Sequence, residues 1–138
     1  MKRKFLLVDD DYEDAHIFRE TLESVDPDVL CYYALHGRDA LDKLESQEIA
    51  IPDIIFLDMK MPVMNGREFL ELIRNHKKFA KIPVLIYSDL EPDPSLLAYP
   101  EVYHYPKAQS LDALKIMLQE ALLIITNTEF SSAYPSFG

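Results

Sequence analysis

The feature of this chain that most restricts its fold is the alternation of short apolar runs with longer amphipathic segments. The apolar runs are rich in β-branched and aromatic residues, which favour strands at this length. They occupy residues 4–8, 29–35, 54–57, 84–87 and 102–105. Strands that alternate with helices form a parallel sheet, because each helix returns the chain to start the next strand in the same direction. The sequence therefore predicts an α/β protein.

Helical patterns separate most of these runs. Asp11 is the expected N-cap of the first helix, which should end near Pro27. Ile17, Thr21, Leu22 and Val25 are predicted to form one face of this helix, the face that packs against the sheet. Further helices are expected over residues 38–47, 67–75 and 110–125.

The segment between the fourth and fifth apolar runs breaks the pattern. Pro92, Pro94 and Pro100 lie where a doubly wound fold places its fourth helix, so this helix should be short or missing. The last helix is apolar on more than one stripe, which indicates that something other than the sheet covers its outer side and leaves a homodimer through this helix open. Residues 126–138 are expected to form a C-terminal tail.

Carboxylates follow two of the predicted strands. Asp9, Asp10 and Asp11 follow the first apolar run, and Asp58 follows the third. The carboxyl ends of neighbouring parallel strands lie at one edge of a sheet, so these side chains can converge. Like charges repel each other, and a divalent cation relieves the repulsion. Because the ligands are hard oxygens with no His or Cys nearby, the sequence favours Mg²⁺ over zinc or copper.

Composition limits the class of protein. With 138 residues and 49% hydrophobic residues, the chain can form one domain, expected over residues 1–125. A net charge of -10 argues against nucleic-acid binding, which depends on clustered Lys and Arg. The sequence shows no export signal or membrane span, and Cys31 is its single cysteine, so a cytoplasmic location is expected.

The acidic residues belong to a wider pattern that resembles the receiver domain of two-component response regulators. The matching residues span the chain from residue 4 to about 125 and follow four of the predicted strands. They are Asp9, Asp10, Asp58, Pro62, Gly66, Ser88 and Lys107. The resemblance implies a doubly wound, flavodoxin-like fold with strand order 2-1-3-4-5 and helices on both faces of the sheet.

The resemblance also implies roles for these residues. Asp58 would accept a phosphoryl group from a histidine kinase or a histidine phosphotransfer protein. Asp10 would bind Mg²⁺ directly, Asp9 would bind it through water or as a second ligand, and the backbone carbonyl of Lys60 would complete the protein's share. The Lys107 ammonium and the Ser88 hydroxyl would contact the phosphoryl oxygens, and their rearrangement would signal to a downstream protein.

Three positions depart from the usual receiver pattern. Lys107 is followed by Ala108, whereas the family commonly has a proline there. The sequence alone therefore does not determine whether Lys107 points toward Asp58. His104 occupies the position of an aromatic switch residue and could respond to pH. Asp89 follows Ser88 where a small residue is usual, and we expect its charge to alter phosphorylation or hydrolysis by repulsion.

We expect a phospho-accepting receiver that is not an enzyme, apart from Mg²⁺-dependent self-phosphorylation and self-dephosphorylation. Three other functions are alternatives to this one. The first is a pseudo-receiver that acts as a binding or dimerisation module without phosphorylation. The second is a phosphohydrolase with an aspartyl phosphate, which is weak because the residue two after Asp58 is Lys60 where enzymes similar to the haloacid dehalogenases have aspartate. The third is a flavodoxin-like cofactor role, and the three aspartates after the first strand argue against it.

Overall fold

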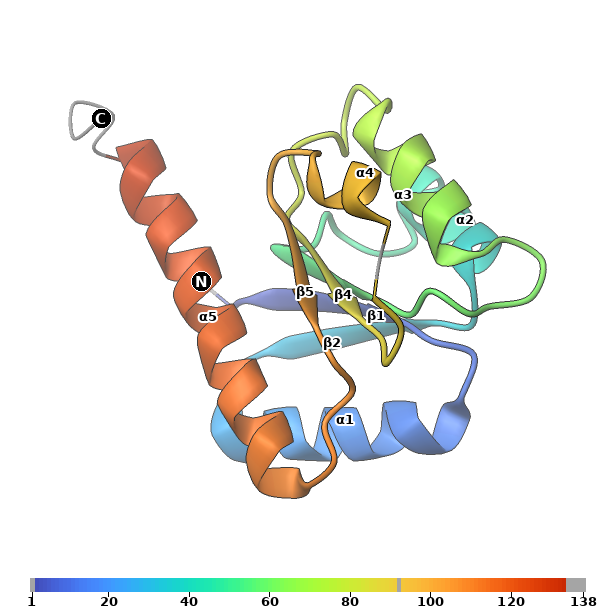
Figure 1. Ribbon diagram of the computed structural model, residues 1–138. Coiled ribbons are helices and arrows are strands. Elements are labelled where there is room, and N and C mark those ends of the chain that lie inside the picture. Colours follow the sequence, from blue (N-terminus) through green and yellow to red (C-terminus); the bar gives the residue numbers. More distant parts are fainter. Residues whose placement is uncertain (1, 92, 134–138) are drawn as a thin grey trace.

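A five-stranded parallel sheet lies between two layers of helices (Figure 1). The computed structural model describes residues 2–91 and 93–133, with the backbone alone for residues 127–133. The strands are β1 (Lys4–Val8), β2 (Leu30–Ala34), β3 (Ile54–Leu57), β4 (Val84–Tyr87) and β5 (Val102–Tyr105). They lie in the order β2-β1-β3-β4-β5, which confirms the predicted fold class and strand order.

The helices are α1 (Tyr12–Val25), α2 (Gly37–Glu45), α3 (Gly66–Arg74), α4 (Pro94–Leu97) and α5 (Leu111–Ala133). Helices α1 and α5 cover one face of the sheet, and α2, α3 and α4 cover the other (Figure 1). The predicted bounds of β2, α2 and α3 differ from those observed by one or two residues at each end. Helix α4 has four residues, as expected from the prolines around it.

The core has two halves, one on each face of the sheet. Successive side chains of β1 alternate, so Phe5 and Leu7 contact the α1 and α5 layer, while Leu6 and Val8 contact the opposite layer. Every residue of β3 and β4 is buried, as expected for strands covered on both faces. This packing fixes the strand ends that carry the predicted site.

The predicted end of the last helix is wrong. Helix α5 does not stop at residue 125 but continues to Ala133, so residues 126–133 are helical rather than part of a tail. No proline or glycine occurs between Leu111 and Ala133, so nothing in this stretch ends the helix at residue 125. Residues 134–138, the rest of the predicted tail, lie outside the described residues.

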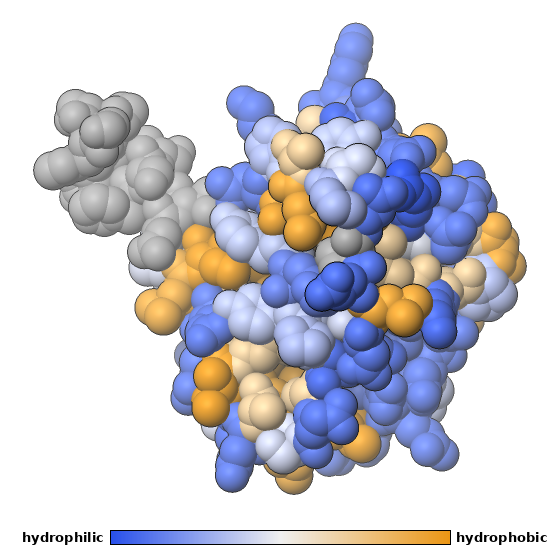
Figure 2. All heavy atoms as spheres, in the orientation of Figure 1, coloured by the Kyte–Doolittle hydropathy of each residue, from blue (hydrophilic) through white to orange (hydrophobic). Residues whose placement is uncertain are grey.

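Exposed apolar side chains occur on both helices of the α1 and α5 layer. The prediction that Ile17 belongs to the buried face of α1 is wrong, because its side chain is 45% exposed and Phe18 is buried in its place. On α5, Leu111, Ile116 and Leu123 are exposed, so nothing within the described residues covers its outer side. Figure 2 shows apolar patches along α5 that hydrophilic side chains separate. None of the described helices has the length and apolar character needed to cross a membrane.

Candidate functional site

The register of the central strands brings two of the predicted carboxylates together. Val8 of β1 pairs with Leu57 of β3, so the next residues, Asp9 and Asp58, leave the sheet side by side. The Asp58 amide donates a hydrogen bond to the Val8 carbonyl at 2.9 Å, which continues the pairing past the last strand residue. Two separate runs of sequence thus place their aspartates at the same edge of the sheet.

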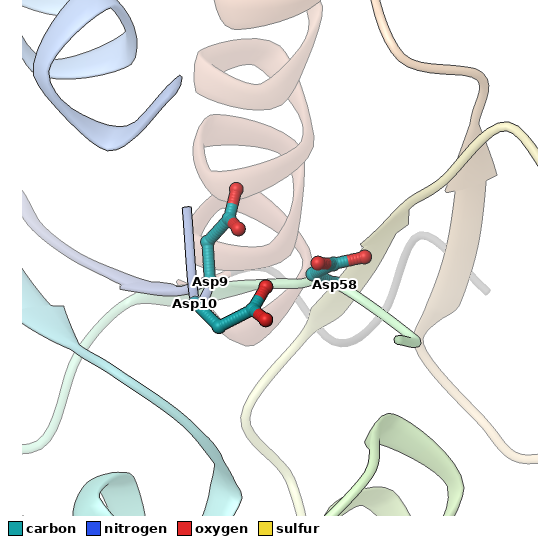
Figure 3. Close-up of side chains that lie close together, drawn as sticks. All are labelled: Asp9, Asp10 and Asp58. Atoms are coloured by element: carbon teal, nitrogen blue, oxygen red, sulfur yellow. The ribbon is translucent and has the colours of Figure 1, made fainter. Parts of the chain in front are cut away.

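Asp9, Asp10 and Asp58 form an acidic cluster at this edge. One carboxylate oxygen from each lies within 4.8 Å of the others (Figure 3). Asp9 and Asp58 are only 1% and 6% exposed, whereas Asp10 is open to solvent. The cluster therefore presents oxygen ligands that converge on a point reachable from outside.

Backbone and side-chain hydrogen bonds hold these carboxylates in place. The Asp9 Oδ1 atom accepts the Asp11 amide at 2.9 Å, and the Tyr33 hydroxyl donates to the Asp9 carbonyl at 2.7 Å. Asp58 Oδ1 accepts the Lys60 amide at 3.3 Å. Each buried carboxylate has at least one donor, so its orientation is set before any ligand binds.

Burial makes the ionised cluster costly. Burial raises the pKa of Asp9 to about 6, against the opposing effects of the Asp11 amide and Lys107. Burial also raises the pKa of Asp58, which Lys107 and the Lys60 amide partly offset. A bound cation would remove this cost, because it favours the charged form of both carboxylates.

Lys107 reaches the acidic cluster from the loop after β5. Its Nζ atom lies 4.0 Å from Asp58 Oδ2 and 3.5 Å from Asp14 Oδ2. Burial lowers the pKa of Lys107, but Asp9, Asp58 and Asp14 together raise it further, so the net shift is upward. The lysine is therefore aimed at the predicted phosphoacceptor although no proline follows it.

Tyr87, which sequence reasoning missed, supports the Lys107 loop. The Ala108 amide donates to the Tyr87 hydroxyl at 3.3 Å, and the Lys107 ammonium lies 5.9 Å from the centre of the Tyr87 ring. A proline at position 108 would lack this amide, so the departure from the family pattern supplies the donor that anchors the loop. The sequence feature that could have indicated this role is the position of Tyr87, a bulky aromatic residue directly before Ser88.

We expect Tyr87→Phe to lower the free energy of unfolding by about 1 kcal/mol, because the variant keeps the ring but loses the acceptor of the Ala108 amide. Urea unfolding followed by circular dichroism measures the change. Tyr12→Phe is the matched control, since Tyr12 is 68% exposed. Equal stability of the wild type and Tyr87→Phe would show that the hydroxyl does not hold the loop.

The loop after β3 approaches the site closely at Gly66. A Cβ atom at this position would lie 2.8 Å from the Asp58 carbonyl oxygen and 2.8 Å from the Met59 Cα atom. A glycine is therefore needed at position 66 for the close approach of these two backbone segments. Asn65 caps the following helix by accepting the Glu68 amide at 3.0 Å, so α3 starts directly beside the site.

The remaining predicted residues lie around this centre. Ser88 is 3% exposed, and its Oγ atom accepts the Leu90 amide at 3.2 Å. The Nε2 atom of His104 lies 3.1 Å from the Ser88 carbonyl oxygen, which connects β5 directly to the loop after β4. Asp89 is exposed and is not a member of the acidic cluster found among the described residues, so its predicted effect on phosphorylation stays a prediction.

The donor set of the cluster fits a magnesium ion. All three converging side chains offer carboxylate oxygens, two of them buried with raised pKa values, and one is exposed on the solvent side. Mg²⁺ prefers few carboxylates and keeps several of its waters, which an open site of this kind allows.

Fold and site together define a flavodoxin-like α/β protein with an acidic site at the carboxyl edge of its sheet. The chain belongs to the response regulator receiver domain family of two-component signalling, whose model matches residues 5–101. This confirms the resemblance predicted from the motif residues.

Solved structures of receivers share this fold. The chemotaxis response regulator CheY4 of Vibrio cholerae is 26% identical, with a TM-score of 0.71 over 87% of this chain and 98% of that one. The phosphorylated cyanobacterial phytochrome response regulator RcpA is 22% identical, with a TM-score of 0.77 over 93% of this chain and 96% of that one. The latter likeness supports the fold alone.

Among curated proteins, the chain is similar to a protein-glutamate methylesterase/protein-glutamine glutaminase of Clostridium acetobutylicum. The two are 36% identical over 89 residues, which cover 64% of this chain and 24% of that protein. A protein of the same description from Treponema denticola is 37% identical over 87 residues, covering 63% of this chain and 22% of the relative. The chain thus matches about a quarter of the length of these relatives.

Proposed function

We propose that this chain is a phospho-accepting receiver that takes a phosphoryl group onto Asp58 from a histidine kinase or a histidine phosphotransfer protein. The observation that carries the proposal is the convergence of a buried aspartate, two further carboxylates and a lysine at one edge of the sheet. Pairing a nucleophilic carboxylate with cations is the arrangement that phosphoryl transfer requires. Family membership supports the same function.

In the proposed transfer, an oxygen of the Asp58 carboxylate attacks the phosphorus atom of phosphohistidine. The new O–P bond forms as the N–P bond breaks, and the imidazole nitrogen leaves with the electron pair. Asp9, Asp10, Asp58 and the Lys60 carbonyl would hold Mg²⁺, which would neutralise phosphoryl oxygens when bound. Lys107 supplies a further positive charge beside the attacking carboxylate.

The output step involves Ser88 and His104. The Ser88 oxygen already accepts the Leu90 amide, so its hydroxyl hydrogen can be donated to a phosphoryl oxygen. A phosphoryl group adds roughly one and a half to two negative charges beside Lys107 and Ser88. Because His104 contacts the Ser88 carbonyl, movement of this loop is passed to the outer face of β5, where a downstream protein would bind.

Mass measurement of the phosphorylated protein tests the proposal. We expect incubation with acetyl phosphate and Mg²⁺ to add the mass of one phosphoryl group to the wild-type chain, and EDTA to prevent the addition. Circular dichroism in both buffers checks that the fold is unchanged. No adduct with an intact fold would contradict the proposal and favour the phosphorylation-independent pseudo-receiver. An adduct that forms equally in EDTA would remove Mg²⁺ from the mechanism.

A further inference from the structure

Among the described residues, Lys107 has two carboxylate partners within 4.0 Å, and the nearer one is outside the acidic cluster. Its ammonium lies 3.5 Å from Asp14 on α1 and 4.0 Å from Asp58. The side chain of Asp14 is 45% exposed, whereas that of Asp58 is 7% exposed. The lysine therefore sits between a buried nucleophile and an accessible competing anion.

The backbone of α1 fixes the position of Asp14. The Asp14 amide donates to the side chain of Asp11, the N-cap of the helix, at 3.1 Å. Its neighbour Glu13 makes the same kind of contact through its amide at 3.0 Å. Both residues are acidic and lie in the first turn, where a carboxylate favours the helix dipole. Of these two residues, only Asp14 forms an ion pair with Lys107 in the part of the chain that the structure describes.

Open space lies beside the lysine on the side of Asp14. A groove of 290 Å³ opens beside it and is lined by Asp14, Tyr87 and Lys107, together with the start of α5. The Tyr87 ring forms one wall, and its hydroxyl anchors the backbone after the lysine rather than the ammonium itself. A shift of Nζ toward or away from Asp58 thus requires no change in the loop backbone.

We propose that Asp14 is a positioning residue that competes with Asp58 for Lys107 and thereby slows phosphorylation of Asp58. This inference rests on the proposed function. In the unphosphorylated protein, the ion pair with Asp14 keeps the Lys107 ammonium farther from Asp58 than it would otherwise lie. Once Asp58 carries a phosphoryl group, the larger negative charge there attracts the lysine away from Asp14.

The test compares initial rates of phosphorylation by limiting acetyl phosphate in Asp14→Asn and Glu13→Gln. We expect Asp14→Asn to raise the rate about two- to fivefold, the range open to a half-exposed ion pair, and higher salt to narrow the difference. Glu13→Gln should leave the rate unchanged, because it removes the same charge from the same turn without touching Lys107. A crystal structure of Asp14→Asn should place the lysine ammonium closer than 4.0 Å to Asp58.

The route through Lys107 is tested by repeating the comparison in a Lys107→Met background, where we expect Asp14→Asn to have no effect. A rate for Asp14→Asn equal to or below that of the wild type would overturn the inference. So would an equal increase in the Lys107→Met background, which would mean that Asp14 acts by repelling the donor alone. If the wild type itself gains no phosphoryl group, the proposed function fails, whereas a phosphorylated wild type with an unchanged Asp14→Asn rejects only the role of Asp14.

Discussion

Asp58→Asn is expected to abolish the phosphoryl adduct, lowering the initial rate of phosphorylation at least about a hundredfold. The amide has no anionic oxygen to attack phosphorus, although it keeps the size of the side chain and can still accept the Lys60 amide. Intact-mass measurements after incubation with acetyl phosphate and Mg²⁺ give the rate. Among the site residues, this substitution should have the largest effect on phosphorylation.

Two comparisons separate loss of the nucleophile from loss of a metal ligand. Asp58→Asn retains Asp9 and Asp10, so excess Mg²⁺ should restore a weakened metal site but not the adduct. The control is Asp28→Asn, which changes an exposed aspartate in the loop before β2 and should leave the rate unchanged. A phosphoryl group on Asp58→Asn would place the phosphoacceptor elsewhere in the chain.

The strands and the acidic cluster could be predicted because their signals are local. Apolar runs of four or five residues that end in aspartate mark both the strand and its carboxyl end, and parallel pairing then brings Asp9 beside Asp58. The short α4 was predictable for the same reason, since prolines limit a helix wherever they occur. Such signals do not depend on which other segments the chain contacts.

The contacts of the Lys107 loop with Asp14 and Tyr87 could not be predicted, because they join distant parts of the sequence. Asp14 lies in the first turn of α1, where a carboxylate favours the helix dipole, and nothing near it in the sequence indicates a lysine from the loop after β5. Tyr87 was assigned only as a strand residue, although its hydroxyl anchors Ala108. The position of Ile17 was missed because Ile17 and Phe18 are both apolar, and only the packing of α1 against the sheet decides which is buried.

The buried carboxylate of Asp9 predicts a stability that depends on pH. Its pKa in the folded chain is about 6, above the ordinary value of 3.8, so the folded protein binds this proton more tightly than the unfolded one. The stabilising effect of the proton is complete below the unfolded pKa and is lost as pH rises through about 6. At neutral pH, without metal, the ionised side chain therefore lowers the free energy of unfolding.

We expect Asp9→Asn to raise the free energy of unfolding of the metal-free protein by about 2 kcal/mol at pH 7.5 and to have little effect near pH 4. The asparagine oxygen can still accept the Asp11 amide, but it carries no buried charge. Urea unfolding in EDTA across this pH range measures the difference, with Asp28→Asn as the exposed control.

Magnesium should reverse the order of stability of the wild type and Asp9→Asn. The ion is attracted to the same charge that destabilises the metal-free cluster. Added Mg²⁺ should stabilise the wild type more than Asp9→Asn, and its affinity for the wild type should fall as pH drops through about 6 and Asp9 takes up a proton. A variant less stable than the wild type at pH 7.5 in EDTA, but not near pH 4, would show that Asp9 contributes to folding as an anion. Ionised Asp9 would then not destabilise the metal-free protein. The charge that attracts Mg²⁺ would in that case not also lower the free energy of unfolding.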